Sequence, residues 1–418
     1  MPITLPPFFG AYTGLRRQCL GLAMLALAPA LQAEPLKDVY EKSAAYKAEA
    51  LQLLERLVNV DSGSANTAGL DTVRGISIEE LRKLGGKIET FPATPHPGTS
   101  VTATFEGGGT RKIMLMAHMD TVFPDGTAKA KPFYIKDDRA YGPGVMDDKG
   151  GIVAGLYAIK ILKDLNFKDY GRITFLLDTN EEVGSEGTSA LIRRVAKAHD
   201  VVLNLEPGRP ADGLVLWRKG SATATIDVKG RAAHAGVAPQ DGRNAVTEVA
   251  HQVLQMGKLG DTEKQTTVNF TAIDANGATN VIPEHAVAKG DVRALSRAEF
   301  DRVESDMARI AQNKLIPDTQ VKTTLTRGLP PMPRTSQAEA LLKTAEAIYA
   351  EIGKKLTVEG SGGAADASLA TDEGVATLDG FGIVGGGIHT PAEYAEVGSI
   401  VPRFYLLTRM VMELSKGH

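Results

Sequence analysis

Short apolar segments alternate with helical segments between residues 112 and 205, and this alternation constrains the fold more than any other feature of the sequence. The segments 112–117, 172–178 and 201–205 are rich in Val, Ile, Leu, Met and Phe, which is typical of buried strands. The segments 152–165 and 185–198 between them have helical periodicity. Strands that alternate with helices predict an α/β fold, with a largely parallel sheet and helices on both of its faces.

A second pattern begins near residue 215. Strands are predicted at 221–228, 266–273, 286–294 and 320–326, and helices at 243–259 and 296–314. The resulting order, β-α-β-β-α-β, is that of a ferredoxin-like α+β unit. Because 418 residues are too many for one small core, we expect a domain made of 34–214 and 327–418 with this unit inserted at 215–326. A long amphipathic helix over 37–60 opens the first domain.

The first 33 residues have the pattern of a secretory signal peptide. Arg16 and Arg17 precede an apolar stretch of about ten residues, and small residues end the segment at Ala33. A buried first helix is the alternative interpretation, whereas a membrane span is excluded because the apolar stretch is too short. We therefore expect a cleaved protein in the periplasm or outside the cell, without membrane contact.

The composition narrows the chemistry that the mature chain can perform. The only cysteine is Cys19, inside the predicted signal peptide, so the mature chain would contain no thiol. Any metal must then be held by His and carboxylate side chains. The net charge of −3 gives no basic excess for binding nucleic acid.

Candidate metal ligands follow the predicted strands. They are His118 with Asp120, the pair Asp147–Asp148, the pair Glu181–Glu182, Glu206 and the late His389. In an α/β sheet, ligands collect where parallel strands end and loops begin. Taken singly, each group has a simpler interpretation, since a lone His is usually structural and an acidic pair is often a solvated turn. Together they offer the imidazole and carboxylate groups that a pair of divalent ions requires.

Charge balance favours a centre with two metal ions. Two divalent ions carry four positive charges. The balancing groups would be Asp147, Glu182, Glu206 and a bridging hydroxide, with His118 and His389 neutral. Glu181 is then left as a general base for a metal-activated water. Asp120 lies two residues after His118 on an extended segment, where it can accept the second imidazole N–H and orient the ring.

Eight short motifs occur in a characteristic order along the chain. They are HMDTVF, YGPGVMDDKGG, DTNEEVGSEG, LEPG, GRAAHAG, NVIP, DVRA and GGGIHTPAEY. From about residue 40 to the C-terminus, the sequence resembles the co-catalytic zinc peptidases of the M20 family and, among them, the bacterial glutamate carboxypeptidases. The resemblance implies a zinc-exopeptidase-like α/β/α catalytic domain, an inserted ferredoxin-like lid and dimerisation domain, and a homodimer formed through the inserted domain.

The same resemblance assigns roles to the candidate ligands. The implied ligands are Asp147 as the bridge between two zinc ions, His118 and Glu206 at one ion, and Glu182 and His389 at the other. Glu181 would be the general base, and Asp120 would orient His118. The resemblance also implies a cis peptide bond between Asp147 and Asp148.

Residues that would contact the substrate lie mainly in the second half of the chain. By resemblance, His234 stabilises the oxyanion, often in the partner's active site, while Asn280 and Arg293 hold the terminal carboxylate. Gly363 belongs to a Gly-rich substrate loop at 360–366, although this loop has Ser-Gly-Gly-Ala-Ala where a third Gly and a Thr are usual. Arg327 is a weaker candidate, for which a surface ion pair is an equal alternative.

The sequence therefore predicts a zinc-dependent exopeptidase. It would hydrolyse the amide bond to a C-terminal amino acid, glutamate in the first instance, in peptidyl, N-acyl or folate-type substrates. A water bridging the metals would attack, with Glu181 as the base. The alternatives are an N-acyl amino acid amidohydrolase or dipeptidase of the same clan, and a periplasmic binding protein without catalysis. Co²⁺ and Mn²⁺ also suit such ligands.

Overall fold

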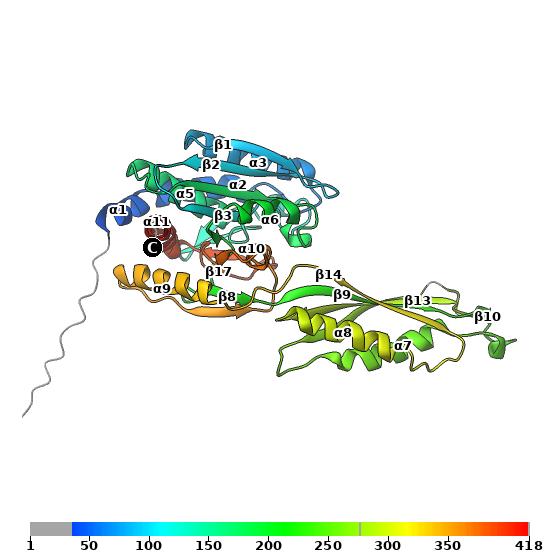
Figure 1. Cartoon of the computed structure of the whole chain (residues 1–418). Coiled ribbons are helices and arrows are strands. Elements are labelled where there is room, and N and C mark those ends of the chain that lie inside the picture. The colour runs from blue at the N-terminus through cyan, green and yellow to red at the C-terminus, as the bar shows by residue number, and fades with distance from the viewer. Residues whose placement is uncertain (1–35, 276, 417–418) are drawn as a thin grey trace, which may run out of the picture.

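The computed structural model describes residues 36–275 and 277–416, so the predicted signal peptide and Cys19 lie outside the described residues. The chain forms a larger unit and a smaller, elongated unit that projects from it (Figure 1). Within residues 36–275 and 277–416, no helix combines the length and the hydrophobicity that spanning a bilayer requires.

A six-stranded sheet forms the centre of the larger unit, with the strand order β1-β2-β6-β3-β7-β16. Its strands are β1 (Lys87–Pro92), β2 (Thr99–Glu106), β3 (Lys112–His118), β6 (Arg172–Asp178), β7 (Val201–Asn204) and β16 (Ala376–Leu378). The strands β6, β3, β7 and β16 are parallel, as the alternating pattern predicted. The strands β1 and β2 were not predicted, and they add an antiparallel edge.

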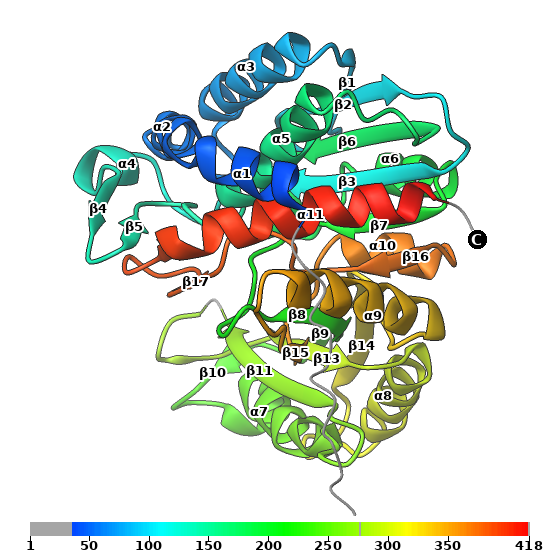
Figure 2. The ribbon, with the colours of Figure 1, turned by 90° about the vertical axis from the view of Figure 1, so that its left-hand side faces the viewer.

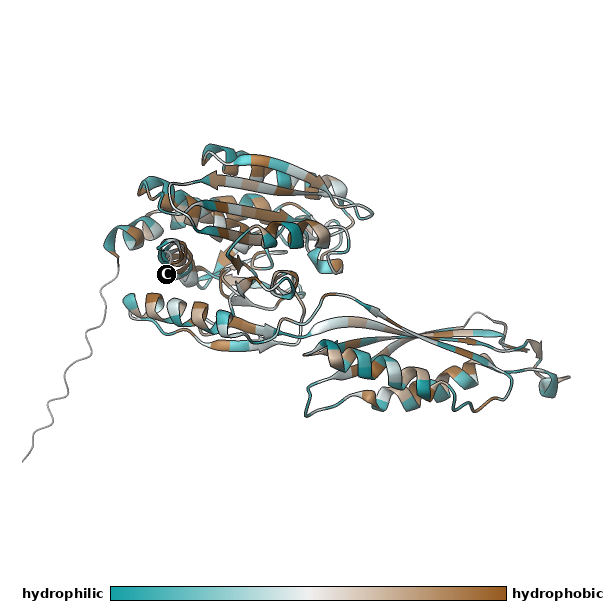
Figure 3. Ribbon diagram, in the orientation of Figure 1, coloured by the Kyte–Doolittle hydropathy of each residue, from teal (hydrophilic) through white to brown (hydrophobic). Residues whose placement is uncertain are grey.

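Helices cover both faces of this sheet because its central strands are apolar on both sides. Ile113 and Leu115 of β3 belong to the core beneath α5 (Lys149–Asp164) and α11 (Ile400–Ser415). Met114 and Met116 point to the opposite face, beneath α6 (Ser189–Lys197) and α10 (Ala367–Asp372). The hydrophobic strands between the helical layers are visible in Figure 3. The predicted α/β/α architecture is therefore confirmed.

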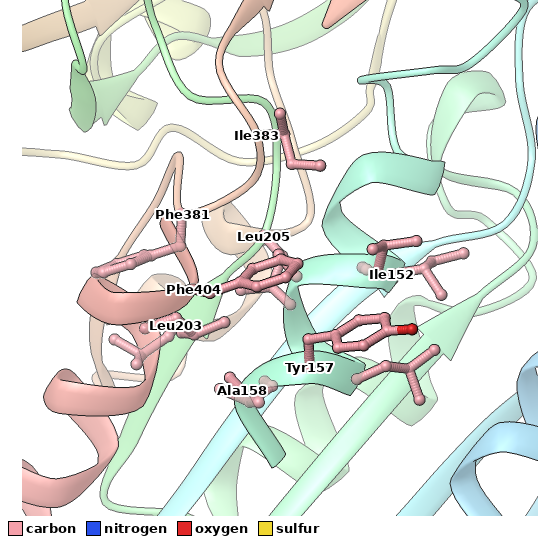
Figure 4. Packing of buried hydrophobic residues seen from close by; sticks show 14 of the residues in the cluster. Ile152, Tyr157, Ala158, Leu203, Leu205, Phe381, Ile383 and Phe404 are labelled. Carbon is pink, nitrogen blue, oxygen red and sulfur yellow. The ribbon is translucent and has the colours of Figure 1, made fainter. Parts of the chain in front are cut away.

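The helices on the α5 face pack through aromatic and aliphatic side chains. Tyr157 of α5 stacks on Phe404 of α11, with ring centroids 5.3 Å apart (Figure 4). Phe381, Ile383 and Leu205 enclose the same cluster, so the segments that carry ligands leave the sheet from a rigid core.

The N-terminal helical segment is two helices, and the prediction of one continuous helix was wrong. α1 (Lys37–Ala45) ends at Tyr46, and α2 (Lys47–Val58) begins directly after it. α1 packs against α11 whereas α2 packs against α5 (Figure 2). The break at Tyr46 allows α1 and α2 to pack against different helices. The helical periodicity of the sequence gives no sign of this break. The remaining helices of the larger unit are α3 (Thr67–Lys83), α4 (Thr127–Ala130) and α9 (Ser336–Glu351).

A small antiparallel sheet brings two distant segments of the chain together. Its order is β17-β18-β5-β4, with β4 (Tyr134–Lys136), β5 (Arg139–Tyr141), β17 (Gly385–Gly386) and β18 (Tyr394–Glu396). In its register Tyr394 lies opposite Tyr141. The loop after β5 leads to Asp147, and the loop between β17 and β18 contains His389, so this sheet places two predicted ligands side by side.

The smaller unit has the predicted β-α-β-β-α-β order. Its elements are β9 (Gly220–Lys229), α7 (Ala245–Met256), β11 (Thr267–Asp274), β13 (His285–Ala294), α8 (Arg297–Ile310) and β14 (Gln320–Arg327). The antiparallel strand order β11-β13-β9-β14 is the ferredoxin-like arrangement. α7 and α8 share one core with this sheet. A short pair, β10 (Ala233–His234) with β12 (Val281–Ile282), lies at the end far from the larger unit (Figure 1).

The two units are joined next to a parallel strand pair. β8 (Leu214–Arg218) pairs with β15 (Val358–Ser361) and thus belongs with the returning half of the chain. The four short 3₁₀ helices are Glu181–Val183, Pro239–Asp241, Gly257–Leu259 and Val397–Ser399 within the described residues. The domain limits at 214 and 326 stay a prediction.

Candidate metal centre

The predicted metal ligands meet at the carboxyl edge of the central sheet. His118 is the last residue of β3, Glu181 and Glu182 lie in the 3₁₀ helix after β6, and Glu206 follows β7. Asp147 comes from the loop that leads into α5, and His389 from the loop between β17 and β18. Parallel strands end at the same edge, which is why residues far apart in the sequence converge here.

The carboxylate of Asp147 lies between the two histidines. Its Oδ1 is 3.1 Å from Nε2 of His118, and its Oδ2 is 3.2 Å from Nε2 of His389. A second carboxylate accompanies each ring, with Glu206 Oε1 3.5 Å from Nε2 of His118 and Glu182 Oε2 3.1 Å from Nε2 of His389. The five side chains thus form two groups that share Asp147.

Glu181 and Glu182 point to different parts of this cluster. Ligand atoms of Glu181 lie within 4.8 Å of those of His118 and Glu206, whereas those of Glu182 lie within the same limit of His118 and Asp147. The adjacent carboxylates therefore separate at the end of β6. The peptide bond between Asp147 and Asp148 is cis, as the family resemblance implied.

Asp120 connects His118 with the acidic pair. Nδ1 of His118 is 3.0 Å from the backbone oxygen of Asp120 and 3.3 Å from its Oδ1. The Asp120 carboxylate also accepts the backbone N–H groups of Glu181 and Glu182, both at 3.2 Å. Ser64 donates a hydrogen bond of 2.6 Å to the same carboxylate. Asp120 is thus placed to orient both the imidazole and the turn that carries the pair.

The electrostatics of the cluster favour bound cations. Burial raises the pKa of Glu181 well above its usual range, with the charge of Glu206 adding to the effect. Burial likewise raises the pKa of Glu182 to about 7. Hydrogen bonds to Asp147 and Glu182 raise the pKa of His389 to about 10. The protein alone thus supplies too little positive charge to keep the carboxyl groups of Glu181 and Glu182 readily ionised. Imidazole nitrogens and carboxylate oxygens are also the ligand atoms that Zn²⁺ and related divalent ions bind. The residues present fit a metal centre.

Glu393 supports the loop that carries Asp147, and this residue was not predicted from the sequence. Its buried carboxylate accepts the backbone N–H groups of Gly144, Met146 and Asp147 at 3.2, 3.0 and 3.2 Å. The only signal in the sequence is its position four residues after His389 in the same motif.

Arg218 is a second supporting residue that the sequence did not reveal. Its Nη2 donates to Oε2 of Glu206 at 3.0 Å, its Nε donates to Asp379, and its Nη1 donates to the backbone oxygen of Gly363 at 3.3 Å. In the sequence this arginine follows an apolar strand and has no motif around it.

The predicted substrate-binding residues occupy three separate places. Gly363 adjoins the metal ligands through Arg218, whereas Arg293 lies near the end of β13 in the smaller unit and donates to Asp291 at 2.9 Å. His234 and Asn280 lie together at the far end of the smaller unit, away from the metal ligands of their own chain (Figure 1). Arg327 forms ion pairs with Asp301 and Glu304, at 3.0 and 2.6 Å, which is the surface alternative considered for it.

Comparison with known proteins agrees with this architecture. The chain is 36% identical to Carboxypeptidase G2 of Pseudomonas sp. (strain RS-16), over 88% of this chain and 89% of that protein. It is 29% identical to a succinyl-diaminopimelate desuccinylase of a Bradyrhizobium species, over 69% of this chain and 79% of that protein.

Solved structures share the fold. Aminopeptidase PepT from Bacillus cereus has a TM-score of 0.73 at 23% identity and covers 88% of this chain and 98% of its own. The M20 metallo-carboxypeptidase Sso-CP2 from Sulfolobus solfataricus has a TM-score of 0.70 at 18% identity, with coverage of 88% and 99%. The family model described as peptidase family M20/M25/M40 matches residues 114–413. The chain therefore belongs to peptidase family M20/M25/M40 and is a metal-dependent hydrolase.

Proposed function

We propose that this protein is a zinc exopeptidase with two metal ions per subunit, and that it removes a C-terminal glutamate from peptidyl, N-acyl or folate-type substrates. The observation that carries the proposal is the position of Asp147, whose two oxygens face His118 and His389. The relationship to Carboxypeptidase G2 supports carboxypeptidase activity. The preference for glutamate rests on the motif resemblance.

The metal ions and the residues around them would have separate roles in catalysis. Bound divalent ions would polarise the scissile carbonyl and lower the pKa of water. We assign to Glu181 the transfer of the proton from the attacking water to the leaving amine, because its carboxylate lies within 4.8 Å of ligand atoms of His118 and Glu206 but makes none of the imidazole contacts that define the two groups around Asp147. Asp120 keeps the Glu181 turn and the His118 ring in position.

Substrate recognition would use both units. Arg293 is the candidate for the terminal carboxylate, since a guanidinium binds a carboxylate through two parallel hydrogen bonds. Gly363 would line the substrate loop. His234 and Asn280 lie far from their own centre, so they would serve the centre of a second copy in a homodimer. Exposed apolar side chains on the smaller unit, Val237, Leu254 and Ile273, support association through it.

Location and metal identity are parts of the same proposal. The pattern of residues 1–33 supports export to the periplasm or beyond, followed by cleavage. His and carboxylate ligands support zinc, while Co²⁺ would be accepted by the same atoms.

Glu181→Gln tests the catalytic assignment. The variant should retain the metal content of the wild type but lose turnover by about 100-fold or more, the range expected for a general base. Metal analysis and steady-state kinetics give the two readouts. Turnover comparable to the wild type would refute the role of Glu181.

A substrate panel tests the specificity. N-acylglutamate, pteroylglutamate and dipeptides would be compared, and Arg293→Ala should raise KM and lower kcat for substrates with a free terminal carboxylate. An unchanged kinetic profile would show that Arg293 is structural.

An N-acyl amino acid amidohydrolase is the second candidate. The similarity to succinyl-diaminopimelate desuccinylases favours it, and faster hydrolysis of N-acyl amino acids other than glutamate would establish it. Tight binding of the panel without hydrolysis in buffer with added zinc would instead indicate a binding protein.

A further inference from the structure

Arg218 lies where the chain crosses between the two units. It is the last residue of β8, and β9 of the smaller unit begins two residues later at Gly220. Its backbone N–H and oxygen pair with Met332, at 2.9 and 3.0 Å, on the segment that returns from the smaller unit. The next residue, Lys219, donates its backbone N–H to the oxygen of Ser361 at 2.9 Å. The segment that enters the smaller unit is therefore hydrogen-bonded here both to the segment that returns from it and to the start of the Gly-rich loop.

The side chain of Arg218 is 3% exposed and reaches three different segments. Its guanidinium donates to Glu206 after β7, to Asp379 after β16, and to the oxygen of Gly363 in the Gly-rich loop. A planar guanidinium with five N–H donors can satisfy several acceptors in fixed directions, which a lysine ammonium on a flexible stem does less well.

The hydrogen bond from Arg218 fixes the orientation of the Glu206 carboxylate. Oε2 of Glu206 accepts from Arg218 at 3.0 Å, whereas Oε1 lies 3.5 Å from Nε2 of His118. One oxygen is therefore held by the arginine, and the other faces the imidazole of His118 and would be free to bind an ion there. Partners of this kind orient a ligand and tune its affinity for the ion.

We propose that Arg218 is a positioning residue that fixes the metal ligand Glu206 to the substrate loop at Gly363 and to the joint of the inserted unit. Movement of the smaller unit would then be transmitted to one of the two metal positions. The part that concerns Glu206 rests on the proposed function, whereas the link between the joint and the loop does not. A purely structural arginine, present only to neutralise the buried Asp379, is the competing explanation.

Two substitutions separate these explanations. Arg218→Met removes the charge and all three hydrogen bonds, while Arg218→Lys keeps a charge but not the planar fork. Arg409→Met is a matched control, because Arg409 is also buried and paired with carboxylates, those of Glu351 and Glu413, on helices away from the centre. Circular dichroism on each variant shows whether it folds, and Arg218→Lys keeps the test open if Arg218→Met does not.

The first readout is hydrogen–deuterium exchange on the metal-free, full-length protein. Both Arg218 variants should exchange faster than the wild type at residues 358–366 and at Lys219, with the larger effect in Arg218→Met. Arg409→Met should leave these residues unchanged. Exchange at the wild-type rate in the Arg218 variants overturns the proposal.

The second readout is Zn²⁺ affinity, measured by competition with a chromophoric chelator. Arg218→Met should bind one of two Zn²⁺ ions about 10- to 100-fold more weakly, the usual effect of removing a ligand's partner. Arg218→Lys should lose less, and Arg409→Met nothing. Wild-type affinity at both positions in Arg218→Met overturns the link to Glu206. If the wild type itself takes up no Zn²⁺, the proposed function fails, and the exchange experiment alone decides the role of Arg218.

Discussion

Glu393 offers a direct test of how the loop around Asp147 is held. Its Oε1 accepts the N–H groups of Met146 and Asp147, and its Oε2 accepts that of Gly144. In Glu393→Gln the amide oxygen can keep the pair of bonds at Oε1, but the amide NH₂ then faces the N–H of Gly144. One hydrogen bond is lost, a buried donor is left without an acceptor, and the two remaining bonds lose their charge.

The cost follows from these changes. An unsatisfied buried donor costs about 1–3 kcal/mol, and a bond to a neutral acceptor is weaker than one to a charged acceptor by about 0.5–1 kcal/mol. Together these losses amount to about 2–5 kcal/mol, but the pKa of Glu393, raised from 4.5 to about 7, means that burying its charge costs about 3 kcal/mol above pH 7, which the neutral glutamine avoids. The two effects nearly cancel, so Glu393→Gln should change the free energy of unfolding of the metal-free protein by no more than about 2 kcal/mol. Zn²⁺ affinity should fall about 10- to 100-fold, because the loop that carries Asp147 is then held by two weaker bonds instead of three bonds to a charged acceptor.

Denaturant titration followed by tryptophan fluorescence measures the stability, since the single tryptophan, Trp217, lies on β8 of the larger unit. Burial raises the pKa of Glu393 to about 7, so the titration is run well above that pH, where the carboxylate is ionised. Glu248→Gln is the matched control. Glu248 is buried in the smaller unit and accepts the backbone N–H of Ile316 at 2.6 Å, so its loss should leave Zn²⁺ affinity unchanged. Wild-type Zn²⁺ affinity in Glu393→Gln would refute the reasoning.

Two further predictions concern packing and pH. A Cβ added at Gly155 of α5 would lie 2.4 Å from Cζ of Phe175, so Gly155→Ala should destabilise the larger unit by about 1–3 kcal/mol in the same titration. At Gly75 of α3 nothing lies within 4 Å of the added Cβ, and Gly75→Ala should be neutral or stabilising by up to about 1 kcal/mol; an equal loss in both variants would contradict the steric argument. Hydrogen bonding to Arg302 lowers the pKa of Glu299 from 4.5 to about 2, so its stabilising effect is present above pH 4.5 and is lost as the pH falls toward 2. Hydrogen exchange of α8 against pH should show this loss in the wild type and a flatter profile in Glu299→Gln, and identical profiles would show that the pair does not stabilise the unit.

The elements that the sequence predicted best are those whose pattern is set locally. The strand at 172–178 was predicted with the bounds that the structure gives, because its apolar run is continuous and ends in Asp178. The β-α-β-β-α-β order was also correct, and its two central strands, β9 and β13, show the clearest alternation between buried and exposed residues. Features that depend on tertiary packing were missed. The break at Tyr46 arises because α1 and α2 pack on different helices, and helical periodicity continues through it.

The same distinction between local features and features of tertiary packing applies to the candidate site. His118, Asp147, Glu182, Glu206 and His389 were predictable as a group because each has a chemically specific side chain at the end of an element, and the structure brings them together. Their roles stay predictions. The supporting residues were not predictable, since Glu393 acts on backbone N–H groups and Arg218 on three segments that meet only in the folded chain. The separation of His234 from its own centre likewise depends on the length of the smaller unit.

The pairing of β18 with β5 has a consequence for the order in which an emerging chain can fold. Residues 139–141 can complete their sheet only after residues 394–396 have emerged. The smaller unit, whose strands all lie between residues 220 and 327, needs no later segment of the chain and can fold earlier. The hydrolytic centre is thus among the last parts of the molecule to form, so an unfinished chain has no competent site.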